Sequence, residues 1–165
     1  MANPGLPPNM PQAMNMRTLA SICNMPQAMK TSISNMGVNR VMCIARITFS
    51  LCDVTSPKLL IGLPHERNVL TEAEHKFLND ENEHILLNEN YEPNSKIRVK
   101  LLEEPNRTTE LSLVKFGILA GYALTDGWES VVQRQNFKFG AADGPDSADL
   151  WCFRAQGFIW FAIHR

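Results

Sequence analysis

The sequence predicts an α+β fold, because segments with strand periodicity and segments with helix periodicity follow one another without a regular βαβ repeat. Three observations carry this prediction. The first two are that residues 41–51 and residues 96–102 each alternate between apolar and polar side chains, as half-buried strands do. A third is the run Thr71-Glu72-Ala73-Glu74, a capping box that is typical of a helix start. We expect a small mixed or antiparallel sheet, two or three helices and an extended N-terminal helical arm.

The chain of 165 residues is expected to divide into an arm, residues 1–38, and a single α+β core domain, residues 39–165. The arm contains a six-residue repeat, since Asn-Met-Pro-Gln-Ala-Met occurs at residues 9–14 and again at residues 24–29. Each copy predicts a helix start, because Asn can cap the free amides and Pro is tolerated in the first turn. The second helix is expected to end at Gly37.

The other elements follow from the same periodicities. The helix that begins at Thr71 is expected to turn Ala73, Phe77 and Leu78 inward. The remaining expected elements are a short strand at 59–63, a helix at 109–124, a strand at 131–139, and a hairpin of 150–155 and 158–164 around Gln156-Gly157. The hairpin is apolar on both faces, so we expect both faces to be buried in the core; the alternative is that one face contacts a partner or a membrane.

The composition excludes several classes of protein. Hydrophobic residues make up 44% of the chain, the formal net charge is −1 and the pI is about 6.4, which argues against a strongly basic nucleic-acid binder. All eight methionines lie in the first 42 residues, and all seventeen acids lie at or after Asp53. The early prolines interrupt any secretory signal, and the cysteines form no C-x-x-C pair, so a cytoplasmic protein with reduced thiols is expected.

Motifs for catalysis are missing from the sequence. The four histidines are scattered, without metal-ligand spacing, and there is no G-x-S-x-G, P-loop or dinucleotide fingerprint. We therefore expect a non-enzymatic protein with no catalytic residue, metal site, cofactor or small-molecule substrate.

The clearest electrostatic feature is a set of cations on the strand at 96–102. Lys96, Arg98 and Lys100 project from one face of that strand, about 7 Å apart, and Arg107 is expected to extend the set. These residues could contact phosphates of a nucleic acid or lipid headgroups. The alternative is a solvent-facing or edge strand that its charge protects from aggregation, which the net negative charge of the core favours.

The methionine-rich arm is the candidate for self-association. Its helices are too short to be stable alone in water, and methionine suits adaptable contact surfaces. An arm of this kind suits exchange between subunits of an oligomer or lattice. The residues expected to make this contact are Met10, Met14, Met16, Leu19, Met25, Met29, Ile33 and Met36.

The organisation of the chain resembles the small matrix proteins of rhabdoviruses, in particular the short plant-virus versions. The long strand at 41–51 and the aromatic hairpin at 151–164 carry this resemblance, together with the proline-rich arm. The chain departs from the family in its acidic pI and in an arm that is not lysine-rich. The resemblance implies a viral protein of the cytoplasm and virion that self-assembles between a nucleocapsid and a membrane.

The main hypothesis is therefore a structural assembly protein that associates with itself through the arm. Two alternatives stay open. One is a small cytoplasmic binding module or enzyme with a site in a core pocket. The other is a nucleic-acid-binding coat protein that uses Lys96, Arg98 and Lys100.

Overall fold

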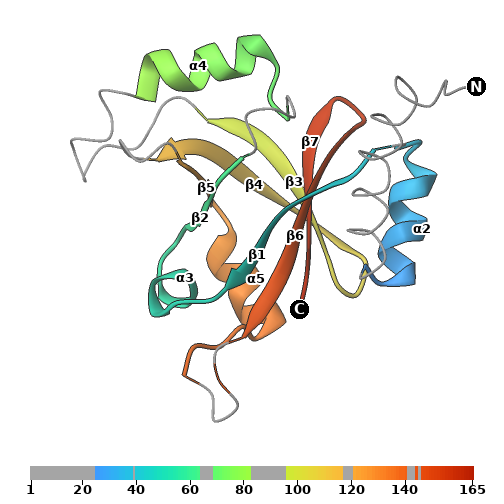
Figure 1. The fold of residues 1–165 in the computed structure, drawn as a ribbon, viewed down its shortest axis with the longest axis vertical. Helices are drawn as coiled ribbons and strands as arrows, with labels where there is room; N and C mark the ends of the chain where they lie inside the picture. Colours follow the sequence, from blue (N-terminus) through green and yellow to red (C-terminus); the bar gives the residue numbers. More distant parts are fainter. Residues whose placement is uncertain are drawn as a thin grey trace, which may run out of the picture.

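The computed structural model describes residues 25–38, 40–63, 69–82, 96–116, 121–140, 144 and 146–165, and it confirms the α+β prediction. Seven strands form one mixed sheet that curls into a nearly closed barrel (Figure 1), in the order β1-β6-β7-β3-β4-β5-β2. The strands are β1 (Met42–Thr48), β2 (Leu59–Ile61), β3 (Ile97–Glu103), β4 (Arg107–Phe116), β5 (Gly121–Thr125), β6 (Ser147–Ala155) and β7 (Phe158–His164). Neighbouring strands are antiparallel except for β3 and β7, which are parallel.

Helices pack against the sheet on three sides (Figure 1). They are α2 (Gln27–Asn35), α3 (Leu51–Thr55), α4 (Glu72–Asn82) and α5 (Trp128–Gln135). Helix α4 lies against β4, and its Glu74 and His75 contact Arg154 of β6 and Tyr122 of β5. Helices α3 and α5 lie together on the opposite side of the molecule from α4.

The inner face of the sheet forms the main core. Alternate residues of each strand point inward, and Val99, Leu101 and Leu113 are fully buried there. Near α3 and α5 the core contains three packed rings, with the centroids of Phe49 and Phe137 4.4 Å apart and Trp128 beside both. The indole of Trp128 donates a hydrogen bond to the carbonyl of Asp53 at 2.8 Å, so the ring cluster also joins α5 to α3.

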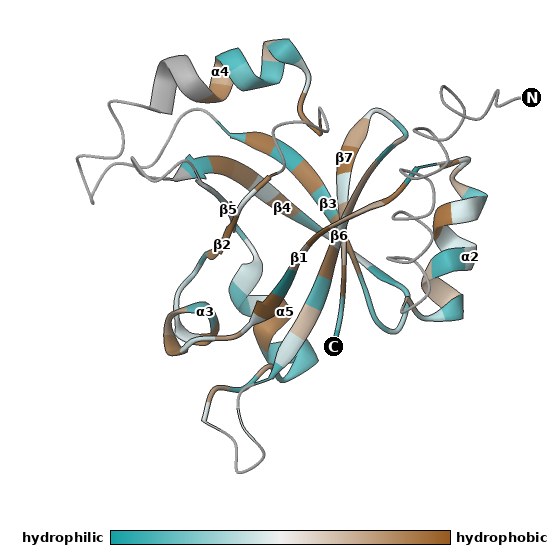
Figure 2. Cartoon of the chain, viewed as in Figure 1, coloured by the Kyte–Doolittle hydropathy of each residue, from teal (hydrophilic) through white to brown (hydrophobic). Residues whose placement is uncertain are grey.

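Helix α2 covers a second apolar cluster on the outer face of the sheet. Its Met29 and Ile33, with Met25 just before it, pack in the cluster that contains Trp151 of β6 and Trp160 of β7. Burying one such side chain is worth about 1.5–3 kcal/mol, so this contact stabilises a helix too short to persist alone. In Figure 2, brown apolar segments run along β6 and β7, while α2 alternates between apolar and polar residues. Both faces of the hairpin are therefore buried, as the sequence predicts.

Several other expected elements are confirmed. Strand β2 falls within 59–63, and the β6–β7 hairpin turns at Gln156 and Gly157, whose φ values of 55° and 79° suit a tight turn. The capping box is complete: Thr71 N donates to Glu74 Oε2 at 2.8 Å, and Glu74 N donates to Thr71 Oγ1 at 3.2 Å. On α4 the inward prediction is right for Leu78 but wrong for Ala73 and Phe77, which are exposed.

Two predicted elements are wrong in type. The expected helix at 109–124 is the strand pair β4 and β5, because residues 111–114 of β4 are all buried and their apolar pattern therefore lacks strand alternation. The expected strand at 131–139 is helix α5 followed by a loop, with the β-branched pair Val131 and Val132 buried on one side of the helix.

The first strand also ends earlier than expected, at Thr48. Ser50 and Asp53 form a capping box, in which Asp53 N donates to Ser50 Oγ at 3.2 Å and Ser50 N donates to Asp53 Oδ2 at 2.8 Å. This box begins α3 at Leu51. The first of the two expected arm helices lies outside the described residues. The second is α2, which ends at Asn35, and Gly37 with φ 77° follows its C-cap Met36. The boundary between arm and core at residue 38 stays a prediction.

Candidate functional site

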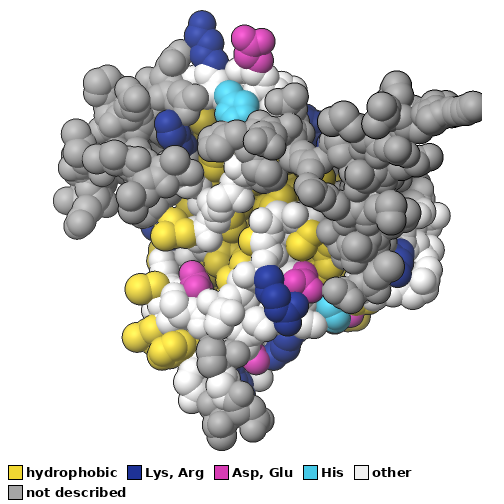
Figure 3. Space-filling view, in the orientation of Figure 1, with side chains coloured by type: hydrophobic (Ala, Val, Ile, Leu, Met, Phe, Trp, Pro, Cys, Tyr) yellow, Lys and Arg dark blue, Asp and Glu magenta, His cyan; other side chains and the backbone are white. Residues whose placement is uncertain are grey.

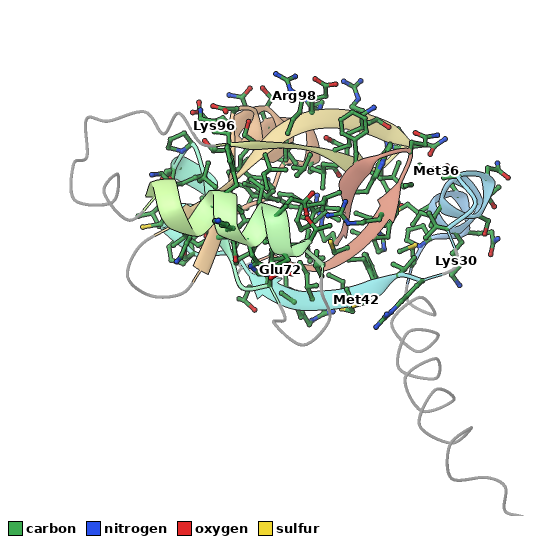
Figure 4. The ribbon with its side chains drawn as sticks, turned by 90° about the horizontal axis from the view of Figure 1, so that it is seen from above. Lys30, Met36, Met42, Glu72, Lys96 and Arg98 are labelled. Carbon is green, nitrogen blue, oxygen red and sulfur yellow. The ribbon has the colours of Figure 1, made fainter. Side chains whose placement is uncertain are left out.

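Three cations line up on the outer face of β3. We call Lys96, Arg98 and Lys100 the basic row. Because Val99 and Leu101 turn into the core, the alternating residues Arg98 and Lys100 point outward. Figure 4 shows Lys96 and Arg98 next to each other at the outer side of the sheet, away from the core.

Two carboxylates lie among these cations. Arg98 Nη1 is 2.5 Å from Glu110 Oε2, and Lys96 Nζ is 2.8 Å from Asp126 Oδ2. The sheet register creates this arrangement, since Glu110 of β4 lies opposite Lys100 and Asp126 directly follows β5. With both acids ionised, the three cations retain a net charge of about +1.

The charged state of Asp126 depends on its neighbours. Partial burial works to raise the pKa of the Asp126 carboxyl, but hydrogen bonds from Lys96 and Ser112 and the charges of Lys96 and Arg98 outweigh it. The pKa of Asp126 therefore lies below its usual value, and the group stays ionised at neutral pH. On the face seen in Figure 3, described Lys and Arg side chains likewise lie beside Asp and Glu side chains, without a large basic patch.

Lys100 is held by aromatic rings. Its Nζ lies 4.4 Å from the ring centroid of Phe158 and 5.5 Å from that of Trp160. Trp160 stacks on Phe153 with centroids 5.8 Å apart, and its indole donates to the carbonyl of Ala155 at 3.1 Å. Because Trp160 belongs to the cluster under α2, this helix supports the ring on which Lys100 rests.

Arg107 occupies a different place from the basic row. It is the first residue of β4 and lies opposite Glu103, whereas Arg98 lies opposite Ser112. The side chain of Glu103 is buried on the inner side of the sheet, and its register partner Arg107 therefore belongs to the same side. Because Arg107 lies at the end of the strand, it is nevertheless exposed.

Comparison with known proteins identifies the family. Residues 23–165 match the family model described as B3 domain-containing protein At2g31720-like. The chain belongs to this B3 family. The B3 domain is a plant DNA-binding domain of transcription factors, and it is not an enzyme domain. No curated protein is significantly similar to the chain.

Family membership corrects the main functional hypothesis. The resemblance to viral matrix proteins is wrong, and with it the expected roles in a virion, at a membrane and with a nucleocapsid. A B3 domain implies a DNA partner in place of a nucleocapsid, and a nuclear location in place of the cytoplasm. The prediction of a non-enzymatic protein is confirmed. The resemblance misled because a long first strand and an aromatic hairpin also suit a closed sheet with a helix packed on its outer face.

Half of the predicted self-association residues are placed by the structure of this B3 chain. Met25, Met29 and Ile33 are buried against the sheet of their own chain, and Met36 is half-buried beside them. The others lie outside the described residues: Met10, Met14, Met16 and Leu19. The four described residues of this set therefore pack within their own chain.

The sequence reasoning missed one charged residue of structural weight, Glu103. Glu103 is the last residue of β3, and its side chain is fully buried. Arg134 Nη2 donates to Glu103 Oε2 at 2.8 Å and Arg134 Nε donates to Oε1 at 3.1 Å, while Thr109 and Gln135 donate at 2.6 and 3.1 Å. The signal was available, because Glu103 shares strand parity with Val99 and Leu101.

The burial of Glu103 does not neutralise it. Burial works to raise the pKa of the Glu103 carboxyl, but hydrogen bonds from Arg134, Thr109 and Gln135 and the charge of Arg134 lower that pKa below its usual value. The network fixes β3, β4 and α5 to one another at the edge of the core.

No three His, Cys, Asp or Glu side chains of the described ranges gather as a metal site. Among the same ranges, no helix is long and apolar enough to cross a membrane.

Proposed function

We propose that this chain binds duplex DNA and takes part in transcriptional regulation in the nucleus. Membership of the B3 family over residues 23–165 is the observation that carries the proposal. The net charge of −1 does not oppose it, because phosphate binding depends on where the cations lie more than on their total.

The basic row is the proposed contact with the DNA backbone. The side chain of Arg98 is 67% exposed, and a guanidinium has five donors, so Arg98 can keep its bond to Glu110 and still donate to a phosphate. Lys100 is partly buried on its aromatic support, which reduces the side-chain entropy that binding would cost. Cations about 7 Å apart along a strand can follow a line of phosphates, and such contacts position a protein without reading sequence.

The test is a fluorescence titration of a randomised duplex with the purified chain at several salt concentrations. We expect binding that weakens as salt rises, with a slope of about −0.9 for each phosphate neutralised. The double variant Lys96→Gln/Arg98→Gln should bind more weakly, and the magnitude of its salt slope should be smaller by about 2.

A matched control removes the same charge elsewhere. Lys76 on α4 and Lys138 after α5 are exposed, and Lys76→Gln/Lys138→Gln should leave the slope within about 0.5 of the parent chain. A parent chain that binds no duplex at low salt would contradict the proposed function. Binding that both double variants retain equally would contradict the assignment of the basic row only.

The location can be tested separately. The full chain fused to a fluorescent protein should accumulate in the nuclei of plant cells. A fusion that stays excluded from nuclei would contradict a direct role in transcription.

A further inference from the structure

We propose that Glu110 and Asp126 are built-in counter-charges that weaken the hold of the basic row on DNA phosphates. The inference rests on the proposed function of the same face, and it assigns these two acids the role of setting affinity. Contacts elsewhere on the DNA would then contribute a larger share of binding, which favours discrimination between sequences over indiscriminate attachment.

The first step is the position of the carboxylates. Glu110 bonds Arg98 and Asp126 bonds Lys96, so two of the three cations pair with a carboxylate, while the Lys100 ammonium lies over the rings of Phe158 and Trp160. The side chains of Glu110 and Asp126 are 53% and 46% exposed. Both acids therefore face the solvent from which a phosphate would approach this row.

The second step is that fold stability does not require these acids. Both carboxylates reach solvent, although the Lys96 side chain is only 25% exposed, and ion pairs at the surface contribute little to folding because solvent screens them and ordering two side chains costs entropy. Lys96 and Arg98 can be hydrated without a carboxylate partner. A phosphate on the row, in contrast, would lie within a few ångströms of two like charges, a distance at which solvent does not fully screen repulsion.

The competing explanation makes the opposite prediction. If Glu110 and Asp126 served mainly to hold Arg98 and Lys96 in a binding geometry, neutralising them would leave the cations less ordered and weaken DNA binding. If they are counter-charges, the same neutralisation tightens binding. The sign of the change separates the two roles.

The experiment measures duplex binding by Glu110→Gln and by Asp126→Asn at about 0.1 M salt and across a salt series. We expect each variant to bind about fivefold more tightly, the equilibrium equivalent of one unit charge at about 4 Å in water. The salt slope should steepen by about 0.9 for each variant. Glu72→Gln is the matched control, because Glu72 is an exposed acid on α4 (Figure 4) and its loss changes the net charge equally.

The outcomes distinguish failure of the inference from failure of the proposed function. Binding by Glu110→Gln and Asp126→Asn that equals or falls below that of the parent, while Lys96→Gln/Arg98→Gln still weakens binding, overturns the counter-charge role alone. Equal tightening by Glu72→Gln also overturns it, because the effect would then reflect net charge. A parent chain without DNA binding overturns both. Asp126 has a positive φ of 59°, a conformation that Asn adopts readily, and Glu110→Gln on a regular strand provides an independent test.

Discussion

The inner and outer faces of β3 carry ion pairs of the same residue types in very different surroundings. On the inner face, Glu103 is fully buried and receives hydrogen bonds from Arg134 and two neutral side chains. On the outer face, Arg98 and Glu110 are 67% and 53% exposed. The difference teaches that burial decides what a charge does in this fold. A buried charged side chain holds strands and helices together, while an exposed one can still bind a ligand.

The largest expected effect comes from the inner face. Glu103→Ala would leave Arg134 without its carboxylate and open a cavity, so we expect a loss of about 3–5 kcal/mol in the free energy of unfolding. Because Arg134 is 29% exposed and can recover some hydration, the loss should lie toward the lower end. Chemical denaturation of the variant and the parent measures it. A loss below about 1 kcal/mol would show that the inner pair is no more important than an exposed one.

A slightly smaller effect is expected under α2, where apolar contact replaces charge. Met29 is 1% exposed, and Met29→Ala should lower the free energy of unfolding by about 2–4 kcal/mol. Ser34→Ala, on the exposed side of the same helix, is the control and should stay within about 0.5 kcal/mol. Equal effects of the two variants would mean that α2 does not pack stably on the sheet.

The pH dependence of stability should also separate the two faces. The pKa of Glu103 in the folded chain lies below its usual value of 4.5, so its contribution is present above pH 4.5 and is lost as the pH falls through the folded pKa. Denaturation curves between about pH 3 and pH 6 should therefore show a steeper acid-side loss for the parent than for Glu103→Gln. Parallel curves would argue that the Glu103 carboxylate gains nothing from its hydrogen bonds.

The smallest effect is expected on the outer face. A double-mutant cycle of Arg98→Ala and Glu110→Ala should give a coupling energy of about 0.2–1 kcal/mol, because both side chains are exposed. The same denaturation assay measures it. A coupling above about 2 kcal/mol would place the outer pair in the same class as Glu103 and Arg134, and would remove the contrast between the faces.

Local patterns predicted part of the fold correctly. The capping box at Thr71, the strand at 96–102 and the hairpin at Gln156-Gly157 depend on residues close in sequence, and each is present. The pattern failed for β4, whose apolar residues point both ways because the sheet buries both faces there. Its Leu111 and Val114 then repeat at a helical spacing by chance.

The sequence pattern predicted the cations of the candidate site but did not predict its acids. Strand periodicity was sufficient to put Lys96, Arg98 and Lys100 on one face. Glu110 and Asp126 belong to other strands or follow them, and only the register brings them to Arg98 and Lys96. The B3 family was also beyond composition and periodicity, since nothing local distinguishes this barrel from other small sheets.

The sequence by itself determined the elements whose signals are local: α2 with its end just before Gly37, the cap of α4, β3 and the final hairpin. Caps, turns and side-chain alternation act between near neighbours, so they can be recognised along the chain. Only the tertiary structure decided that Glu103 is an inner charge, that Arg98 is an outer one, and that the methionines of α2 pack on the chain's own sheet. Burial and pairing join residues far apart in sequence, and their energies depend on which strands become neighbours.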